Sequence, residues 1–252
     1  MRLDKYLAEK FGSRTKAAQA ISSGQVLVNG KPVSPSYEFL GGDEIELIAP
    51  EESYVSNGGY KLSKALKDFH FEVSGLVALD VGASNGGFTD CLFKNGIKKV
   101  YCLDVGESQL DKSLLDKNVV VIDNFNARNL TSDMFDEQID LAVADVSFIS
   151  LTYILRQVAN AVKDGGYIIA LIKPQFECDG NNIGKRGIVK DPAIHRKVIT
   201  KIYDFATEAG LGAINLTNAP IVEGKNKEYL ILLKKNSPHK IDKNCLIKHV
   251  KL

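Results

Sequence analysis

The chain has 252 residues, 44% of them hydrophobic and 25% charged, and its formal net charge is +1. This composition is typical of a folded globular protein and excludes a chain that is disordered over most of its length. No run approaches the roughly 20 apolar residues that span a bilayer, and Met1–Lys5 contains no apolar signal-peptide core, so we expect a cytoplasmic protein without stable membrane association.

The first 50 residues predict a small α+β domain. Ser13 is a good N-cap for a second helix and Gly24 is placed to end it, while Asn29-Gly30 is a typical tight hairpin turn. The expected elements are helices over residues 3–11 and 13–24, followed by short strands over 26–28, 31–33 and 44–48. A unit of this size buries only a modest core on its own.

A polar connection that includes Gly58 and Gly59 follows this domain, and we place the domain boundary there. The next unit opens with a helix expected from about Tyr60 to Phe69. The predicted organisation is therefore a small domain over residues 1–50, a linker over 51–59 and a second domain over 60–252.

Strands alternate with helices in the second domain. Apolar strands are expected over residues 76–80, 100–104, 119–122, 139–143, 167–172, 214–216 and 229–233, with helices over 88–94, 154–162 and 195–209. Strands separated by helices in this way favour a mostly parallel, doubly wound sheet. The predicted fold class is α/β, with a seven-stranded Rossmann-like sheet.

Positive charge gathers near both ends of the chain. Met1–Lys31 contains six basic residues and two acidic ones, and Lys225–Leu252 contains eight lysines and two acids. Local positive segments on a nearly neutral chain suit a polyanionic partner such as RNA. The alternative is a set of solvated faces with a lysine-rich tail.

Small residues and acids follow the first strands of the predicted sheet, at the edge where such sheets bind ligands. The turn from Asp80 to Phe88 reads Asp-Val-Gly-Ala-Ser-Asn-Gly-Gly-Phe, which lets a ligand approach the backbone and the free N–H groups of the next helix. Asp104 ends the second strand, where an acid can accept hydrogen bonds from ribose hydroxyls. The alternatives are a plain strand-to-helix turn and a surface acid.

These segments indicate an adenosine-containing cofactor. Ser84 stands where the NAD fingerprint has its middle glycine, and acids attract a sulfonium but repel a pyrophosphate. S-adenosylmethionine is therefore the favoured cofactor. The four cysteines lack metal-ligand spacing, so reduced thiols and no metal are expected. The candidate cofactor residues are Asp80, Gly82, Ser84, Gly86, Gly87, Phe88, Asp104, Asp145 and, more loosely at the adenine edge, Asn126 and Ala127.

Two further segments follow the fourth and fifth strands, namely Asp145-Val-Ser-Phe148 and Lys173-Pro-Gln-Phe176. Amine-directed methyltransferases commonly carry an Asn/Asp-Pro-Pro-aromatic turn after the fourth strand, and this chain lacks its prolines. A lysine beside an acid instead favours a hydroxyl acceptor, because a lysine can remove or polarise a hydroxyl proton. The alternative is that Lys173 is an ordinary surface lysine.

Several motifs in this order resemble the TlyA family, whose members are known as hemolysins and as ribosomal RNA 2′-O-methyltransferases. The motifs are Asn57-Gly-Gly-Tyr-Lys-Leu62, Asp80–Asp90, Asp145-Val-Ser-Phe-Ile-Ser150, Lys173-Pro-Gln-Phe-Glu177 and Val189-Lys-Asp-Pro192. The resemblance implies a class I methyltransferase sheet and, over the first 50 residues, an RNA-binding domain. It also implies ribosomal RNA or ribosomal subunits as partners, with cytidine as the modified nucleotide. Asn57 and Asn85 depart from the family, which often has Arg and Thr there.

The catalytic domain of this family is similar to the FtsJ/RrmJ type, which uses a Lys-Asp-Lys-Glu set. In this sequence the set falls on Lys61, Asp145, Lys173 and Glu228, with Glu223 as a lower-ranked alternative to Glu228. We expect Lys173 to remove or polarise the proton of a ribose 2′-hydroxyl, while Asp145 and Glu228 hold the two lysines. The expected RNA contacts are Arg2, Lys5, Arg14, Lys16, Lys31, Lys185, Arg186 and Arg196.

Three other functions remain open at this level. A membrane-lysing protein needs an amphipathic or spanning apolar segment, which the sequence does not offer. A non-catalytic RNA-binding protein would keep the fold but not bind the cofactor. A small-molecule O-methyltransferase would have no use for the basic N-terminal domain.

Overall fold

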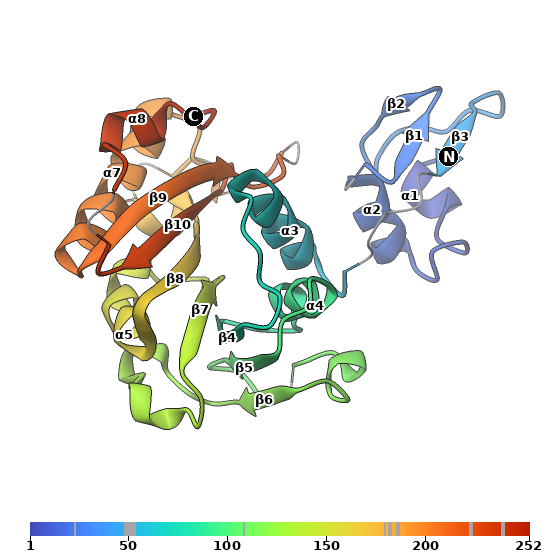
Figure 1. Ribbon diagram of the computed structural model, residues 1–252. Helices are drawn as coiled ribbons and strands as arrows, with labels where there is room; N and C mark the ends of the chain where they lie inside the picture. The colour runs from blue at the N-terminus through green and yellow to red at the C-terminus, as the bar shows by residue number, and fades with distance from the viewer. Residues whose placement is uncertain are drawn as a thin grey trace. The chain divides into compact units, whose positions relative to one another are not determined.

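Two structural units make up the protein in the computed structural model (Figure 1). The described residues are 1–22, 24–47, 54–107, 109–178, 180, 183–184, 187–221, 224–237 and 240–252. The smaller unit is N-terminal, and the larger one contains Tyr54–Ile221 and Lys225–Leu252.

The N-terminal unit packs two short helices against a three-stranded antiparallel sheet. Its elements are α1 (Leu3–Tyr6), α2 (Arg14–Ser22), β1 (Val26–Val28), β2 (Lys31–Pro32) and β3 (Ile45–Leu47), with strand order β2-β1-β3. Ser13 caps α2, as predicted, by accepting the backbone N–H of Lys16 at 3.1 Å. The first helix ends at Tyr6 rather than at residue 11. From Leu7 the chain continues as tight turns up to Gly12, whose φ is +77°.

The larger unit is built on the predicted seven-stranded sheet, in the order β6-β5-β4-β7-β8-β10-β9. The first five strands in this order are parallel, whereas β10 runs antiparallel to both of its neighbours. The strands are β4 (Val77–Val81), β5 (Lys99–Leu103), β6 (Val119–Ile122), β7 (Ile139–Ala144), β8 (Val162–Ile172), β9 (Leu211–Asn218) and β10 (Tyr229–Lys235). The strand order reverses between β4 and β7, where doubly wound sheets place their ligands.

Helices cover both faces of this sheet (Figure 1). Val77, Leu79 and Val81 of β4 pack into the core beneath α5 and α7, whereas Ala78 packs into the core beneath α3 and α4. This alternation follows from the two-residue period of a strand. The helices are α3 (Asn57–Phe69), α4 (Gly87–Lys94), α5 (Leu155–Ala161), α6 (Pro174–Glu177), α7 (Pro192–Glu208) and α8 (Lys243–Ile247), with 3₁₀ turns at Lys112–Leu114, Ala127–Asn129, Ser132–Met134 and Leu151–Tyr153.

In the larger unit, α3, α7, β8 and β9 start three to five residues before their predicted starts. Helix α3 starts at Asn57 instead of Tyr60, so residues 57–59 of the predicted linker are helical, and residues 51–53 lie outside the described part of the chain. Gly59 is required there because a Cβ would overlap the ring of Tyr54. Strand β8 starts at Val162, five residues before the predicted start at residue 167. Within the described residues, no helix combines the length and apolarity needed to cross a bilayer.

Candidate active site

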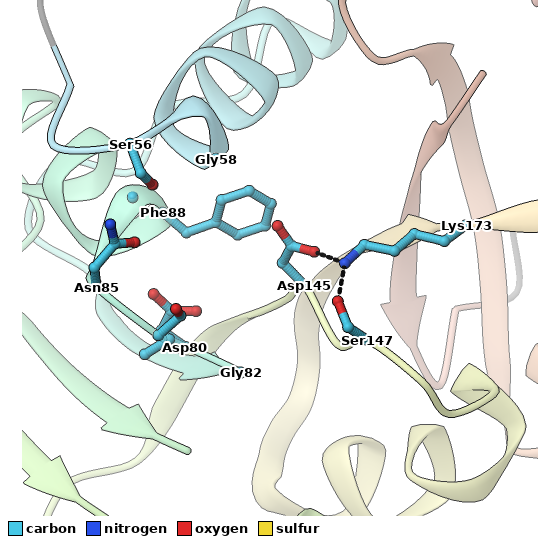
Figure 2. Close-up of a pocket in the computed structure, with 12 residues that line it drawn as sticks. Ser56, Gly58, Asp80, Gly82, Asn85, Phe88, Asp145, Ser147 and Lys173 are labelled. Carbon is cyan, nitrogen blue, oxygen red and sulfur yellow. Dashed lines mark hydrogen bonds and ion pairs between the residues drawn. The ribbon is translucent and has the colours of Figure 1, made fainter. Parts of the chain in front are cut away.

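A pocket opens at the carboxyl ends of β4, β7 and β8 (Figure 2). It lies at the reversal of strand order, where the sequence predicted a ligand. Its walls come from the start of α3, the turn between β4 and α4, and the ends of β7 and β8. The lining residues are Ser56, Gly58, Asp80, Gly82, Ala83, Ser84, Asn85, Gly87, Phe88, Asp145, Ser147 and Lys173.

Asp80 lies in the wall of this pocket with no solvent-exposed surface of its own. Its Oδ2 accepts the hydroxyl of Thr89 at 2.7 Å, while its Oδ1 has no hydrogen-bond partner among the described residues. Burial raises the pKa of Asp80 to about 7 against the lowering effect of the Thr89 hydrogen bond, and the charges of Asp145 and Asp104 raise it further. A buried acceptor without a partner is costly, so this oxygen is suited to a cationic or hydrogen-donating ligand.

The glycines of the turn after β4 are required by close packing. Gly82 has φ +82°, and a Cβ there would lie 2.8 Å from the carbonyl oxygen of Asp145. A Cβ on Gly87 would overlap the Ser56 hydroxyl, and it would lie 3.1 Å from the backbone nitrogen of Gly59. The turn therefore sits directly against the end of β7 and the start of α3, which brings the three walls of the pocket together.

The remaining predicted cofactor residues lie behind or beside the pocket lining. Asp104 accepts the backbone N–H of Ser84 at 2.7 Å and that of Gly106 at 2.8 Å, so it ties the end of β5 to the glycine turn. Asn126 caps a 3₁₀ turn by accepting the N–H of Arg128, and Ala127 is buried in the core. Neither of the last two lines the pocket, nor does Gly86. Their contacts with a cofactor stay predictions.

The four predicted catalytic residues form two ion pairs. Lys173 Nζ lies 2.6 Å from Asp145 Oδ1 and also donates to Ser147 Oγ at 2.6 Å (Figure 2). Lys61 Nζ of α3 lies 2.6 Å from Glu228 Oε2, and the alternative Glu223 lies outside the described residues. Tyr229 of β10 pairs with Ile172 of β8, so Glu228 and Lys173, which come next to them in sequence, lie at the same edge of the sheet.

Several residues of this region were not singled out from the sequence. Ser56 lines the pocket just before α3, and Ser147 receives a hydrogen bond from Lys173. Phe148 is 90% exposed with φ +64°, and its ring centroid lies 5.1 Å from that of Phe176. Such a backbone conformation is uncommon for a bulky residue and often marks a functional site. An aromatic residue in a polar loop after a strand was the available signal.

The predicted RNA-binding residues are mostly exposed. Arg2 and Arg14 both pair with Asp4, at 2.8 and 3.2 Å, yet their side chains remain 48% and 56% exposed. The hydrogen bond from Arg2 holds the pKa of Asp4 below its usual range, so both arginines keep a charged partner. Lys5, Lys16 and Lys31 are exposed in the N-terminal unit, Arg196 is exposed on α7, and Lys185 and Arg186 lie outside the described residues.

Comparison with known proteins agrees with this architecture. Residues 54–236, well over half of the chain, match the FtsJ-like methyltransferase family, and residues 1–45 match the S4 domain. Hemolysin A of Brachyspira hyodysenteriae is 41% identical over 91% of this chain and 98% of its own length. The 16S/23S rRNA (cytidine-2′-O)-methyltransferase TlyA of Mycobacterium tuberculosis is 36% identical over 88% of this chain and 84% of its own length.

A solved structure of a hemolysin-type protein from Streptococcus thermophilus also aligns with nearly the whole chain. It is 36% identical, has a TM-score of 0.76, and the alignment covers 99% of this chain and 94% of that one. The family match covers every element of the pocket, and the alignments with these three relatives cover 88–99% of this chain. The chain therefore belongs to the FtsJ-like methyltransferases that carry an N-terminal S4 domain, which is the TlyA family that its motifs resemble.

Proposed function

We propose that this protein transfers the methyl group of S-adenosylmethionine to a ribose 2′-hydroxyl of ribosomal RNA, at a cytidine. The observation that carries the proposal is the Lys173–Asp145 ion pair. It lines one wall of the pocket, and the buried Asp80 lines another wall of the same pocket. The relative from M. tuberculosis, named for this reaction on 16S and 23S rRNA, supports the choice of substrate.

The pocket fits this cofactor in its charge. The unpartnered oxygen of Asp80 and the carboxylates of Asp104 and Asp145 favour a cation. The same acids would repel the pyrophosphate of a dinucleotide. Bound here, S-adenosylmethionine supplies an electrophilic methyl group on a positively charged sulfur. The glycine turn offers backbone close to the ligand, and Asp104 keeps free lone pairs for ribose hydroxyls beside its two backbone hydrogen bonds.

Lys173 is placed to hold the attacking hydroxyl. An ammonium group has three donors; among the described contacts, Lys173 donates one proton to Ser147 and forms an ion pair with Asp145, which leaves a donor for the 2′-oxygen. When the oxygen gains the methyl group it must lose its proton. Lys173 can pass one of its protons to the Asp145 carboxylate and, as the neutral amine, take up the hydroxyl proton, so the ammonium is restored and the carboxylate is the final acceptor. Lys61, held by Glu228, adds a second positive charge that stabilises the oxygen as its charge changes.

Phe148 gives this site a surface for the base of the target nucleotide. Its exposed ring lies beside Phe176, whose ring is 5.8 Å from Lys173 Nζ. Enzymes that modify a nucleotide take it out of its stack, and aromatic side chains receive unpaired bases by stacking.

We expect Phe148→Ala to lower kcat/KM for RNA by about 10- to 100-fold, since stacking contributes about 1–3 kcal/mol per base. The cofactor Kd should not change, because Phe148 does not line the pocket. Steady-state methyl transfer and cofactor calorimetry measure the two quantities. Phe148→Tyr keeps the ring and serves as the control, with kcat/KM close to the unmodified protein. Equal activity of the Ala and Tyr variants would show that the ring has no part in RNA binding.

The proposed function is tested by mapping methyl groups on ribosomal RNA. RNA and intact subunits from cells that lack this protein are incubated with the purified protein and S-adenosylmethionine, and the modified nucleotides are located by mass spectrometry. We expect a new methyl group on a ribose oxygen of cytidine. A methyl group on a base, or none on either RNA or subunits while the cofactor binds, contradicts the proposal.

A further inference from the structure

Glu177 is a buried carboxylate that the proposed methyl transfer does not use. Its side chain is 2% exposed, and it lies at the end of α6, four residues after Lys173. Oε1 accepts the backbone N–H of Leu151 at 2.7 Å, and Oε2 accepts the hydroxyl of Ser150 at 2.5 Å. Lys201 of α7 forms an ion pair with Oε2 at 3.2 Å and donates to the backbone oxygen of Glu177 at 2.9 Å.

These contacts join the two loops that carry the Lys173–Asp145 pair. We name residues 145–150, after β7, the β7 loop, and residues 173–177, after β8, the β8 loop. The ion pair joins the first residues of the two loops, Asp145 and Lys173, at 2.6 Å. In the middle of the loops, the ring of Phe148 packs against that of Phe176. Glu177 joins the far ends and is the most deeply buried of the three links. The spacing of the loops, and with it that of lysine and carboxylate, therefore depends on this anchor.

The anchor depends more on its buried hydrogen bonds than on its ion pair. Lys201 is 44% exposed, and exposed ion pairs contribute little because solvent screens them. The bonds from Ser150 and Leu151 are shielded from water and end on a charged acceptor, which makes them short and directional. In Glu177→Gln only one of the two side-chain oxygens remains. If that oxygen accepts from Leu151, the NH₂ group faces the donors Ser150 and Lys201, and the reverse orientation has the same defect at Leu151.

We propose that Glu177 is the positioning residue of this site: its carboxylate fixes the β7 loop against the β8 loop and so holds Lys173 Nζ at Asp145. The effect on catalysis rests on the proposed function, whereas the link between the loops does not. Glu177 touches neither the cofactor pocket nor the ion pair. It acts through Lys173, and a misplacement of about 1 Å at a reacting group can lower the rate as much as 100-fold.

The link between the loops is tested by hydrogen exchange on the full chain. In Glu177→Gln, peptides that cover the β7 loop and Leu151 should exchange at least about ten times faster, because the amide of Leu151 loses its charged acceptor. The matched control is Asp140→Asn. Asp140 also accepts a backbone N–H, that of Val77 at 2.8 Å, and pairs with Lys163, but it lies at the amino end of β7, away from the pocket. Unchanged exchange in the β7 loop of Glu177→Gln overturns the proposal.

The catalytic effect is tested by a double-mutant cycle, well below the melting temperature of each variant. Glu177→Gln should lower kcat about 10-fold, with KM for RNA and the cofactor Kd within about 2-fold. In a Lys173→Ala background the same change should have no further effect, because the two residues act as a unit. A 10-fold loss that persists without Lys173 would overturn the positioning role. If the unmodified protein transfers no methyl group to RNA, the proposed function fails, and the hydrogen-exchange result still decides whether Glu177 links the loops.

Discussion

Lys173→Ala is expected to lower kcat for methyl transfer to RNA by about 100- to 10,000-fold, which is the range that a positioned acid–base group contributes. Lys173 is the group of this site that contacts both Asp145 and Ser147, so its loss removes the donor that holds the 2′-hydroxyl and the route by which the proton reaches the carboxylate. Single-turnover kinetics at saturating cofactor and RNA measure this step without product release.

Two control variants separate this role from folding and from charge. Lys163→Ala removes a lysine that pairs with Asp140 at 2.5 Å at the opposite edge of the sheet, and its activity should stay within 2-fold of the unmodified protein, about the scatter expected of surface changes. Lys173→Arg keeps the positive charge but replaces a compact ammonium by a planar guanidinium, and should recover little activity. A folded Lys173→Ala variant that transfers methyl groups at the original rate excludes the proposed chemistry.

The order of strands in the sheet and the proximity of Lys173 to Asp145 could be predicted from the sequence for the same reason. Buried parallel strands appear as short apolar runs between helices, and the carboxyl ends of neighbouring strands meet at one edge. Asp145 follows the run of β7 and Lys173 that of β8, and the structure pairs β7 with β8. The convergence of the two side chains therefore followed from strand order and not from any local signal.

Features that depend on close approach between distant segments were out of reach. Helix α3 begins with Asn57, Gly58 and Gly59, which have low helix propensity and were assigned to the linker. Gly59 is required there because a Cβ would overlap the ring of Tyr54, and Gly87 is required because a Cβ would lie 3.1 Å from the backbone nitrogen of Gly59. Tertiary contact thus overrides local preference.

Two residues near the site have roles in the structure that the sequence did not predict. Asn126 was placed beside the cofactor because it follows β6; its side chain caps the next turn, and its contact with a cofactor stays a prediction. Helix α6 was not predicted from the sequence, because a proline directly after a strand usually indicates a turn. Proline is, however, also well suited to the first turn of a helix, which is where Pro174 lies. Glu177 was given no role of its own from the sequence, because its hydrogen-bond partners Ser150 and Leu151 lie 27 and 26 residues away.

Cofactor binding is expected to tighten as the pH rises through about 7, and Asp80 is the cause. In the free protein burial raises the pKa of Asp80 to about 7, so at pH 6 the carboxyl is mostly neutral. A cationic ligand beside Oδ1 favours the carboxylate, so binding below pH 7 must release a proton. Kd for S-adenosylmethionine should fall up to 10-fold between pH 6 and 7 and level off above about pH 8. Calorimetry in buffers of different ionisation enthalpy measures both the Kd and the released proton.

Asp80→Asn should remove this pH dependence and weaken cofactor binding about 10- to 100-fold at pH 8, because the attraction between the Asp80 carboxylate and the cationic ligand is lost. The free protein should respond in the opposite sense. Because the folded pKa of Asp80 lies above its ordinary value of 3.8, its contribution to stability is complete below pH 3.8 and is lost as the pH rises through about 7. The melting temperature of the ligand-free protein should therefore fall between pH 6 and 8, and this fall should be smaller in Asp80→Asn.

Asp140→Asn is the control for both measurements. Burial raises the pKa of Asp140, but its hydrogen bonds with Lys163 and Val77 together outweigh this effect and lower the pKa, so Asp140 is ionised throughout this pH range. The variant should change neither the slope of Kd with pH nor that of the melting temperature. A Kd for S-adenosylmethionine that is the same at pH 6 and 8, with no proton released, would mean that the buried oxygen of Asp80 does not face the positive charge of the ligand. The pocket would then need another group to account for its preference for a cation, because Asp145, the other acid of its lining, is already paired with Lys173.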